Sequence, residues 1–396
     1  MKILWFVSTI EDTRFLNEFA KNFRGTIDVF HLNFITRISM LGFRGRHFYP
    51  VSPTEYRNTE VCVAHTFNVL SGRLTESEAK AAYASTTYVL DTNSEYLKDT
   101  IFFIPSGRHV HHVAAREYSD RKNLDCVYIN YSNFPGYTFF DPKGTDCLSS
   151  IYNKPNRLDD LYPNAVDVCS VFEKFSRLKE QQTSIPQAAN VGVSKKLKST
   201  AFIFDSLIQK LFRFYGDRRV RFNTKNMTED ISIEYDELSS IKDDYFFFPL
   251  QVSTDQQVLV NYDGGSIYKA IDEAIKVAER KQRVLVIREH PAESMVSNIR
   301  NYLIKKRQRY NCLKVVDVPV HKLIDDCESV ITINSTVGLE SRLMHKKVIF
   351  LGRSFYEKAT DQQLAKYLDR YFVSVDYHHP KLNSVTVSEI LKYKHE

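Results

Sequence analysis

The chain alternates between short hydrophobic runs and longer amphipathic stretches. Residues 3–7 form a β-rich hydrophobic run, and hydrophobic side chains then recur at helical spacing from Phe15 to Phe23. Residues 27–34 resume a strand after Gly25, which predicts a β-α-β unit at the start of the chain. Further short strands are expected at residues 101–104 and 126–131.

From about residue 245 the alternation becomes regular. Strands are expected at residues 245–252, 283–287, 313–316, 329–333 and 347–351. Helices are expected between them at residues 267–280, 294–309, 320–327 and 337–345. Strands that alternate with helices build parallel sheets covered on both faces. The expected fold is therefore α/β, with two Rossmann-type domains facing across a cleft.

The length of 396 residues also fits two domains. We expect an N-terminal domain over residues 1–235, a C-terminal domain over residues 236–375, and a tail over residues 376–396 that packs back on the N-terminal domain. The first turn, residues 8–12, has no glycine-rich phosphate fingerprint, and its acidic side chains would repel a diphosphate. A nucleotide site is therefore expected in the C-terminal domain.

Positive charge is concentrated in one segment. The formal net charge is +6, whereas residues 195–225 hold nine lysines and arginines against Asp205 and Asp217, a net +7. Hydrophobic residues recur at helical spacing from Phe204 to Tyr215 within it. An interfacial helix on an anionic membrane is one interpretation; a packed helix with a basic outer face is the one we favour. Such a local patch favours an anionic surface or polymer over a nucleic-acid partner.

Other composition signals mainly exclude classes of protein. The six cysteines form no Cys-x-x-Cys pair, which is typical of reduced thiols in a cytosolic protein. His109, His111 and His112 cluster in a loop-like stretch, and we interpret them as solvated or acceptor-facing rather than as metal ligands. No metal or cofactor is expected. The chain has no run of 18 hydrophobic residues, so we expect a cytoplasmic protein, with peripheral binding to the inner membrane as an open alternative.

Three polar segments follow expected strands of the C-terminal domain. They are Gln251–Asp255, Arg288–Pro291 and Asn334–Glu340. Ligands of open α/β sheets bind at the carboxyl ends of the strands. A carboxylate, an imidazole and a pair of hydroxyl groups at that edge suit the transfer of a sugar from a nucleotide donor.

Each segment also has an ordinary structural interpretation. Asn334, Ser335 and Thr336 open a helix whose N–H groups and dipole attract anions, although Ser and Thr are common caps, and Gly338 would let a ligand come close. Pro291 fixes His290, which can protonate or hydrogen-bond a leaving phosphate, and Arg288 can pair with a phosphate or carboxylate. Asp255 can act as nucleophile or base, with Asp263 as the rival; either can instead be a turn residue.

Residues 248–255, 286–291, 330–340 and 348–352 together resemble the bacterial capsule polysaccharide biosynthesis proteins. These are CMP-Kdo-dependent β-Kdo transferases of capsule and O-antigen (lipopolysaccharide) assembly, where Kdo is 3-deoxy-D-manno-oct-2-ulosonic acid. In the N-terminal half, Gly136-Tyr137 and residues 144–150 carry a weaker resemblance. The resemblance implies a GT-B-like fold and a retaining reaction without a metal.

The resemblance also implies roles for individual residues. Asp255 would attack the anomeric carbon of Kdo and form a covalent glycosyl-aspartate, while His290 would contact the CMP phosphate. Ser335 and Thr336 would bind the phosphate or the Kdo carboxylate. The donor-binding positions are expected to be Gln251, Arg288, Pro291, Asn334, Ser335, Thr336, Gly338 and Glu340. The acceptor would be a saccharide or a lipid-linked glycan.

The acceptor-side base is left open. Phe134-Pro135 stands where family members often carry a glutamate pair, which leaves Glu117, Asp141 and Asp146 as candidates. Two alternative functions also remain: an inverting CMP-sialic acid transferase with Asp263 as base, and a non-catalytic polysaccharide-binding or export protein.

Overall fold

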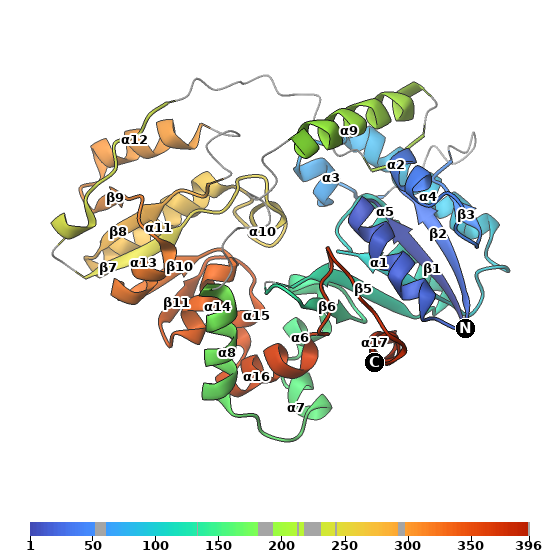
Figure 1. Cartoon of the computed structure of the whole chain (residues 1–396). Helices are drawn as coiled ribbons and strands as arrows, with labels where there is room; N and C mark the ends of the chain where they lie inside the picture. Colours follow the sequence, from blue (N-terminus) through green and yellow to red (C-terminus); the bar gives the residue numbers. More distant parts are fainter. Residues whose placement is uncertain are drawn as a thin grey trace. The chain divides into compact units, whose positions relative to one another are not determined.

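The computed structural model describes residues 1–51, 61–132, 134–180, 193–211, 214–217, 231–241, 244–291 and 298–394, without the side chains of residues 193–199 and 210. The chain forms two compact units, and each contains its own sheet of mostly parallel strands (Figure 1). The first unit comprises residues 1–163, 191–223 and 366–396, and the second comprises residues 164–190 and 224–365. Two α/β units of Rossmann type confirm the fold class predicted from the pattern.

The sheet of the first unit has the strand order β3-β2-β1-β4-β5-β6. Its strands are β1 (Lys2–Val7), β2 (Thr26–His31), β3 (His47–Phe48), β4 (Thr100–Pro105), β5 (Cys126–Tyr131) and β6 (Thr138–Asp141). All neighbours are parallel except β5 and β6. The chain therefore leaves β1 in one direction and returns on its other side at β4.

Helices cover both faces of this sheet because the strand residues are hydrophobic on both sides. Ile3 and Trp5 pack against α1 (Ile10–Lys21), whereas Leu4 and Phe6 pack towards α4 (Glu76–Thr92) and α5 (Val110–Lys122). The remaining helices of this unit are α2 (Phe34–Ser39), α3 (Phe67–Leu70), α6 (Ser150–Asn153), α7 (Arg157–Leu161), α9 (Val193–Leu211) and α17 (Ser384–Ile390).

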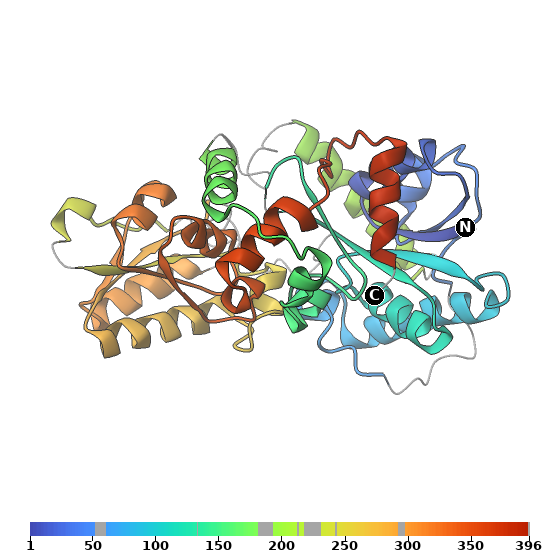
Figure 2. The ribbon, with the colours of Figure 1, turned by 90° about the horizontal axis from the view of Figure 1, so that it is seen from below.

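The C-terminal segment completes the first unit (Figure 2). Val373 forms an isolated β-bridge with Thr138, and the Tyr371 hydroxyl donates to Asp141 Oδ2 at 2.9 Å. Val387 and Ile390 of α17 join the core on the α1 face of the sheet. The return segment begins at Lys366, ten residues before the expected start of the tail.

The second unit repeats the same topology with five parallel strands. They are β7 (Tyr245–Pro249), β8 (Val284–Arg288), β9 (Leu313–Val315), β10 (Ser329–Thr332) and β11 (Lys347–Phe350), in the order β11-β10-β7-β8-β9. The helices are α8 (Val168–Glu180), α10 (Gln256–Leu259), α11 (Ile267–Lys281), α12 (Ile299–Arg309), α13 (Val320–Asp326), α14 (Thr336–Leu343), α15 (Phe355–Lys358) and α16 (Asp361–Lys366), which ends at the unit boundary.

Alternation along β7 decides which helices lie on which face. Phe246 and Phe248 are in the core with α11 and α12, whereas Tyr245 and Phe247 are in the core with α13. Successive strand residues point to opposite faces, so a strand hydrophobic at every position needs helices on both sides. The predicted strands and helices of this half are present within a few residues, apart from residues 292–297, which lie outside the described part of the chain.

The expected boundary at residue 235 needs correction. Residues 164–190 belong to the second unit, because α8 packs against α14. The Phe172 ring lies 5.7 Å from the His345 ring, and Lys179 Nζ lies 3.3 Å from Glu340 Oε1. These contacts are far apart in sequence, so periodicity does not reveal them.

Helix α9 has an unusual distribution of polarity. Its buried positions are polar, namely Asp205, Ser206 and Gln209, whereas Phe204, Leu207 and Leu211 are 65%, 52% and 77% exposed. The favoured interpretation of a packed helix with a basic outer face is therefore wrong for the described side chains. Most of the basic residues of segment 195–225 lie outside the described residues.

The histidine-rich stretch also differs from the expectation. α5 begins at Val110, so His111 and His112 are helical, and His109, His111 and His112 are all buried instead of solvated. Within the described ranges, no group of three or more His, Cys, Asp or Glu side chains could hold a metal ion. All six cysteines are free. The described part of the chain contains no helix that is both long and hydrophobic enough to cross a membrane.

Candidate functional site

The topology of the second unit defines where a ligand would bind. From β7 the chain runs outward to β8 and β9, and then returns to β10 on the other side of β7. In open α/β sheets the crevice at such a switch point, at the carboxyl ends of the strands, is the usual ligand site. The segments that follow β7, β8 and β10 are the three polar segments found in the sequence, so the structure brings them to one edge of one sheet.

Asp255 is held at the start of α10. Its Oδ1 atom accepts a hydrogen bond from the backbone N–H of Gln257 at 2.8 Å, so Asp255 is the N-cap of that helix. The residue is half-buried. The cap fixes the direction of the carboxylate, and the charged acceptor strengthens the bond.

The segment after β10 opens α14 as expected. Ser335 is the N-cap, and its hydroxyl accepts from the backbone N–H of Val337 at 3.1 Å. The Ser335 N–H in turn donates to Thr332 Oγ1 at 3.3 Å. Ser335 and Thr336 are both half-buried. The cap interpretation of Ser335 is thus correct, and it leaves the hydroxyl at the positive end of an eight-residue helix.

Gln257 joins the two segments, and sequence reasoning missed it. Its backbone N–H donates to the Asp255 carboxylate in the cap. Its Oε1 atom accepts from Asn334 Nδ2 at 2.8 Å and from Asn261 Nδ2 at 2.6 Å. Gln251 Oε1 also accepts from the Asn334 N–H at 3.4 Å. Asp255 and Asn334 are therefore fixed by the same glutamine. An amide side chain in the first turn after a capping aspartate was the available signal.

The end of β8 supplies Arg288 and His290. The N–H of Leu250 donates to the Arg288 carbonyl at 2.9 Å, which fastens this end to the β7 loop. Burial lowers the pKa of His290, and the Arg288 charge lowers it further, so its neutral form predominates at pH 7. Glu289 makes structural contacts: it pairs with Arg300 at 3.0 Å and accepts from the Tyr235 hydroxyl at 2.7 Å. Pro291 is exposed.

Two polar atoms at this edge are buried without a hydrogen-bond partner. They are Arg288 Nε and Asn334 Oδ1, in the part of the chain that the structure describes. Buried polar groups are nearly always paired, so each unpaired one needs an explanation such as an absent ligand. One is a donor with positive charge and the other an acceptor, which suits an anionic ligand that also carries hydroxyl or amino groups.

Two residues of the segment after β10 serve packing. A Cβ at Gly338 would lie 2.8 Å from Thr332 Cγ2 and 2.9 Å from Phe350 Cε1. The missing side chain of Gly338 thus faces the sheet, and the expectation that it admits a ligand is wrong. Glu340 points to α8, where Lys179 pairs with it at 3.3 Å. Burial raises the pKa of Glu340, and Lys179 opposes that shift.

The rival aspartate has a different environment. The side chain of Asp263 is 87% exposed, and its Oδ1 lies 3.4 Å from Arg353 Nη2. That same nitrogen donates to the Val260 carbonyl at 2.7 Å. Asp263 is thus a solvated surface acid, whereas Asp255 is fixed at the switch point.

The three acids considered for the acceptor side occupy unlike positions in the first unit. Asp141 has no exposed surface and accepts from the N–H groups of Lys143, Gly144 and Ser150 and from the Ser150 and Tyr371 hydroxyls. Burial raises its pKa. Glu117 lies in α5 and accepts from the Tyr83 hydroxyl. Asp146 is half-buried after β6, next to Thr145, whose hydroxyl donates to the Ser106 carbonyl at 2.7 Å.

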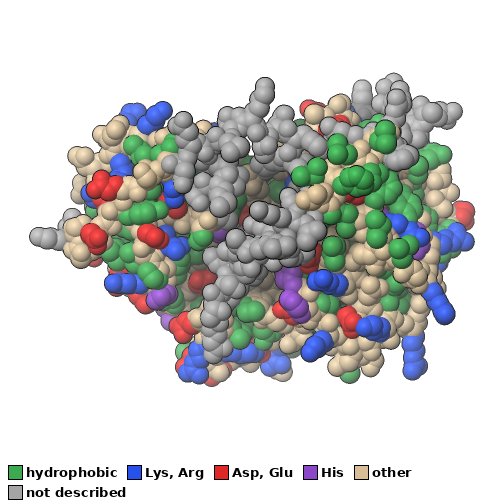
Figure 3. All heavy atoms as spheres, turned by 45° about the horizontal axis from the view of Figure 1, so that its top comes forward, with side chains coloured by type: hydrophobic (Ala, Val, Ile, Leu, Met, Phe, Trp, Pro, Cys, Tyr) green, Lys and Arg blue, Asp and Glu red, His purple; other side chains and the backbone are tan. Residues whose placement is uncertain are grey.

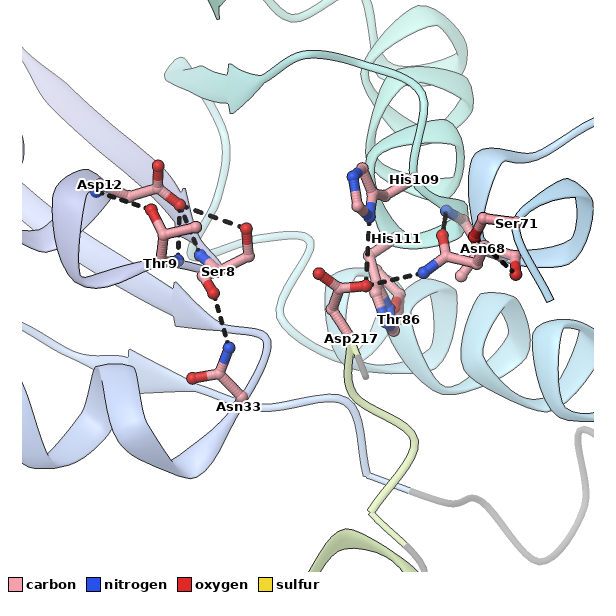
Figure 4. Close-up of polar contacts among 11 residues, drawn as sticks. Ser8, Thr9, Asp12, Asn33, Asn68, Ser71, Thr86, His109, His111 and Asp217 are labelled. Atoms are coloured by element: carbon pink, nitrogen blue, oxygen red, sulfur yellow. Dashed lines mark hydrogen bonds and ion pairs between the residues drawn. The ribbon is translucent and has the colours of Figure 1, made fainter. Parts of the chain in front are cut away.

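Asp12, which follows β1, is likewise structural. Its Oδ2 atom accepts from the N–H groups of Ser8 and Thr9 at 2.7 and 2.8 Å, and its Oδ1 atom accepts from the Tyr377 hydroxyl. The Thr9 hydroxyl accepts from the Asp12 N–H at 3.0 Å, which completes a capping box at the start of α1 (Figure 4). In the first unit, Asp141 and Asp12 thus stabilise the segments that follow the strands.

Comparison with known proteins adds the family. The profile described as "Capsule polysaccharide biosynthesis protein" matches residues 163–370, just over half of the chain. The chain belongs to this family. The matched range contains the complete second sheet and all three polar segments. The resemblance seen in the sequence is therefore confirmed at the level of the family.

Individual relatives of this capsule polysaccharide biosynthesis protein match over shorter stretches. Protein FixF of Sinorhizobium fredii is 33% identical over 115 residues, which are 28% of this chain and 27% of FixF. Capsule polysaccharide export protein KpsS of Escherichia coli is 27% identical over 120 residues, which are 28% of this chain and 31% of KpsS. The chain thus matches less than a third of the length of either relative.

Among solved structures, KpsC of Thermosulfurimonas dismutans, a β-Kdo 2,7 transferase, aligns with the complete chain. The identity is 11%, the alignment covers 100% of both chains, and the TM-score is 0.43. The β-Kdo 2,4 transferase of the same KpsC aligns over 74% of this chain and 87% of that one, with 13% identity and a TM-score of 0.39.

Proposed function

We propose that this protein is a glycosyltransferase that moves Kdo from CMP-Kdo to a saccharide or lipid-linked acceptor in the synthesis of a capsule or O-antigen polysaccharide. The observation that supports this most is the fixed carboxylate of Asp255 at the switch point of a unit that belongs to the capsule polysaccharide biosynthesis family. Arg288, His290 and the N-terminus of α14 line the same edge.

The donor carries two anionic groups, the phosphate of CMP and the carboxylate of Kdo. The unpaired Arg288 Nε and the N-terminus of α14 with its Ser335 and Thr336 hydroxyls would bind these groups. Asn334 Oδ1 would accept from a sugar hydroxyl. Neutral His290 would donate an N–H hydrogen bond to the phosphate as it leaves.

The reaction would run in two steps with retention of configuration. An Asp255 oxygen bonds to the anomeric carbon while the bond from that carbon to the CMP phosphate oxygen breaks, which leaves a glycosyl-aspartate. The acceptor oxygen then bonds to the same carbon, the Asp255 carboxylate leaves, and the acceptor proton passes to a base. A monophosphate donor needs less charge neutralisation than a diphosphate donor, so the proposal includes no metal.

Replacement of Asp255 tests the proposal. In Asp255→Asn the amide cannot form the glycosyl ester, so CMP release from CMP-Kdo should fall by about 10³-fold or more. Because Asn caps a helix about as well as Asp, the variant should fold and bind CMP normally. Asp263→Asn is the matched control, and it should release CMP like the wild type. The measurement is CMP release from fresh CMP-Kdo, with CMP-sialic acid in parallel.

The other outcomes identify the alternatives. Full activity of Asp255→Asn would contradict the role of Asp255 as the nucleophile. Release from CMP-sialic acid alone, lost in Asp263→Asn, would favour the inverting transferase. Acceptor binding without release from either donor would favour a binding or export protein.

We further propose that the enzyme works at an anionic membrane surface, to which α9 attaches. Phe204, Leu207 and Leu211 recur at helical spacing and are exposed, while Asp205, Ser206 and Gln209 of the same helix are buried. Asp205 and Asp217, the only acids of segment 195–225, are both buried, and by sequence the other charged residues of that segment are all basic. Exposed apolar side chains flanked by basic residues suit a surface of anionic lipids. Figure 3 shows hydrophobic side chains exposed over this part of the molecule.

A further inference from the structure

An exposed tyrosine lies at the carboxyl ends of β8 and β9 in the second unit. Tyr235 is 39% exposed, and its hydroxyl donates to Glu289 Oε2 at 2.7 Å. Glu289 follows the end of β8 directly, between Arg288 and His290. The Tyr235 side chain therefore lies at the same edge of the same sheet as the polar segments of the candidate site.

The backbone around Tyr235 is fixed against β9, the last strand of the sheet. The Asp236 N–H donates to the Val315 carbonyl at 2.7 Å, and the Val315 N–H donates to Asp236 Oδ2 at 2.8 Å. Arg307 of α12 donates to the Glu234 carbonyl at 2.6 Å and to the Asp236 carboxylate at 3.1 Å. Hydrogen bonds on both sides of Tyr235 thus hold this segment in place.

The side chain of Tyr235 is fixed as well. Glu289, which accepts from its hydroxyl, is itself held by Arg300 at 3.0 Å, and Arg300 Nη1 donates to the Ile231 carbonyl at 3.0 Å. Partial burial, the hydrogen bond to Glu289 and the charge of Glu289 raise the pKa of Tyr235 to about 12. The hydroxyl therefore stays protonated at neutral pH and keeps this bond, which keeps the ring in one orientation.

A fixed aromatic ring that the fold leaves exposed can bind a flat ligand group. The hydroxyl of Tyr235 is already paired with Glu289, so the surface that the residue presents to a ligand is its ring. A nucleobase is such a flat group, and bases stack on aromatic side chains because every base has a π-face.

The spacing along the edge also suits a nucleotide. β8 and β10 are separated by β7 alone, and neighbouring strands lie about 4.8 Å apart, so their carboxyl ends are about 10 Å apart. Ser335 and Thr336 open α14 after β10, whereas Tyr235 contacts the end of β8 on the side of β9. A nucleoside monophosphate carries its base and its phosphate at opposite ends of the ribose, so it can contact both places at once.

We infer that the cytosine base of the CMP donor stacks on the ring of Tyr235. This inference rests on the proposed function and adds to it a site for the base. Tyr235 binds the donor and takes no part in the bond changes at the anomeric carbon. The contact is the same before and during the reaction, so loss of the ring should raise KM for CMP-Kdo and leave kcat nearly unchanged.

Comparison of CMP with ribose 5-phosphate, which is CMP without its base, tests the inference by calorimetric titration. Tyr235→Ala should weaken CMP binding by about 5- to 150-fold, the contribution of one stacked base, and leave ribose 5-phosphate binding unchanged. Tyr235→Phe keeps the ring and should bind CMP like the wild type. Tyr310→Ala is the matched control, because Tyr310 is half-buried and precedes β9 at the opposite edge of the sheet.

A fluorescent variant gives a readout that keeps an aromatic ring in place. The sole tryptophan of the chain, Trp5, is buried in the first unit. Tyr235→Trp introduces an indole at the proposed stacking position. CMP should quench the fluorescence of this variant, and ribose 5-phosphate should not.

Normal CMP binding by Tyr235→Ala would overturn the inference, as would an equal loss of CMP and ribose 5-phosphate binding, which would show that the ring only supports the fold. Tyr235→Trp fluorescence that CMP does not quench, or that both ligands quench equally, would also overturn it, so a misfolded Tyr235→Ala does not prevent a decision. A wild type that binds no CMP and releases none from CMP-Kdo would instead contradict the proposed function itself.

Discussion

At the scale of single residues, the environment of His290 restricts what it can do. Burial and the Arg288 charge both lower its pKa, so the imidazole is uncharged at neutral pH before a ligand binds. A neutral imidazole has one N–H group to donate. The structure therefore favours hydrogen bonding to the leaving phosphate over transfer of a proton already held by a free imidazolium.

Substitutions at His290 distinguish these roles. His290→Gln keeps an N–H donor, so CMP release without acceptor should stay within about tenfold of the wild type, whereas His290→Ala should lose about 10²-fold or more. The wild-type rate of this half-reaction should fall little between about pH 6.5 and 8, since the lowered pKa makes the imidazolium the minor form in that range. An equal loss of CMP release in His290→Gln and His290→Ala, together with a wild-type rate that falls as pH rises, would show that the protonated form of His290 is required.

At the scale of elements, the site depends on how closely α14 approaches the sheet. Gly338 lets the helix lie against Thr332 of β10 and Phe350 of β11, and the same helix carries the Ser335 cap. A Cβ at Gly338 would lie only 2.8 Å from Thr332 Cγ2 and 2.9 Å from Phe350 Cε1, which is too short, so a side chain here would push α14 outward. The position of the Ser335 and Thr336 hydroxyls is thus set by a glycine that touches no ligand.

Replacement of Gly338 tests this dependence. Gly338→Ala should lower the free energy of unfolding of the second unit by about 1–3 kcal/mol and weaken CMP binding. Thr332→Ser removes the clashing methyl group but keeps the hydroxyl that accepts from the Ser335 N–H. The double variant should therefore recover part of both losses. Urea denaturation and calorimetric CMP titration measure the two effects, and an unchanged Gly338→Ala protein would contradict the packing argument.

At the scale of the whole molecule, the polar segments and the exposed hydrophobic side chains of α9 belong to different elements. The three polar segments lie at the carboxyl edge of the second sheet, whereas the exposed hydrophobic side chains of α9 lie on a helix whose Asp205, Ser206 and Gln209 are buried. Asp205 explains that polar face, because its Oδ1 accepts from the Phe34 N–H at 2.7 Å and its Oδ2 accepts from Gln209 at 2.6 Å. The hydrogen bond from Phe34 to Asp205 holds α9 by its polar side, and Phe204, Leu207 and Leu211 stay exposed to solvent.

Charge introduced on that side tests the proposed attachment. Phe204→Glu combined with Leu207→Glu should reduce co-sedimentation with vesicles containing phosphatidylglycerol by about 100-fold or more, since two large side chains no longer enter the lipid. Val385→Glu, at an equally exposed hydrophobic residue of α17, is the matched control and should bind normally. High salt should also weaken wild-type binding. Equal vesicle binding by the double variant would contradict the proposal, and a dimer lost in that variant would indicate a second copy as the partner.

The sequence determined the elements of this protein and their order. The hydrophobic patterns predicted the strands of the second sheet with the helices between them, and four strands of the first sheet, because a residue repeatedly buried on one side must recur at the period of its element. They did not predict β3, β6 or the helices α2 to α5. The same pattern located the three polar segments directly after β7, β8 and β10. Since parallel strands end at one edge, their convergence also followed from the sequence.

Only the tertiary structure decided which side chains are committed to the fold. Asp141 and Asp12 read as candidate or repelling acids, yet each is buried and accepts several hydrogen bonds from the chain around it. Asp217 carried no signal that local sequence could reveal, and Gln257 was indicated only by its place after a capping aspartate. Their partners lie as far away as Tyr371, Tyr377, Asn334 and His109. Periodicity reports the face on which a residue lies, but the group that meets it there depends on contacts across the chain. For the same reason α9 could be recognised as amphipathic from its sequence, while the side that faces outward was decided by the hydrogen bonds of Asp205.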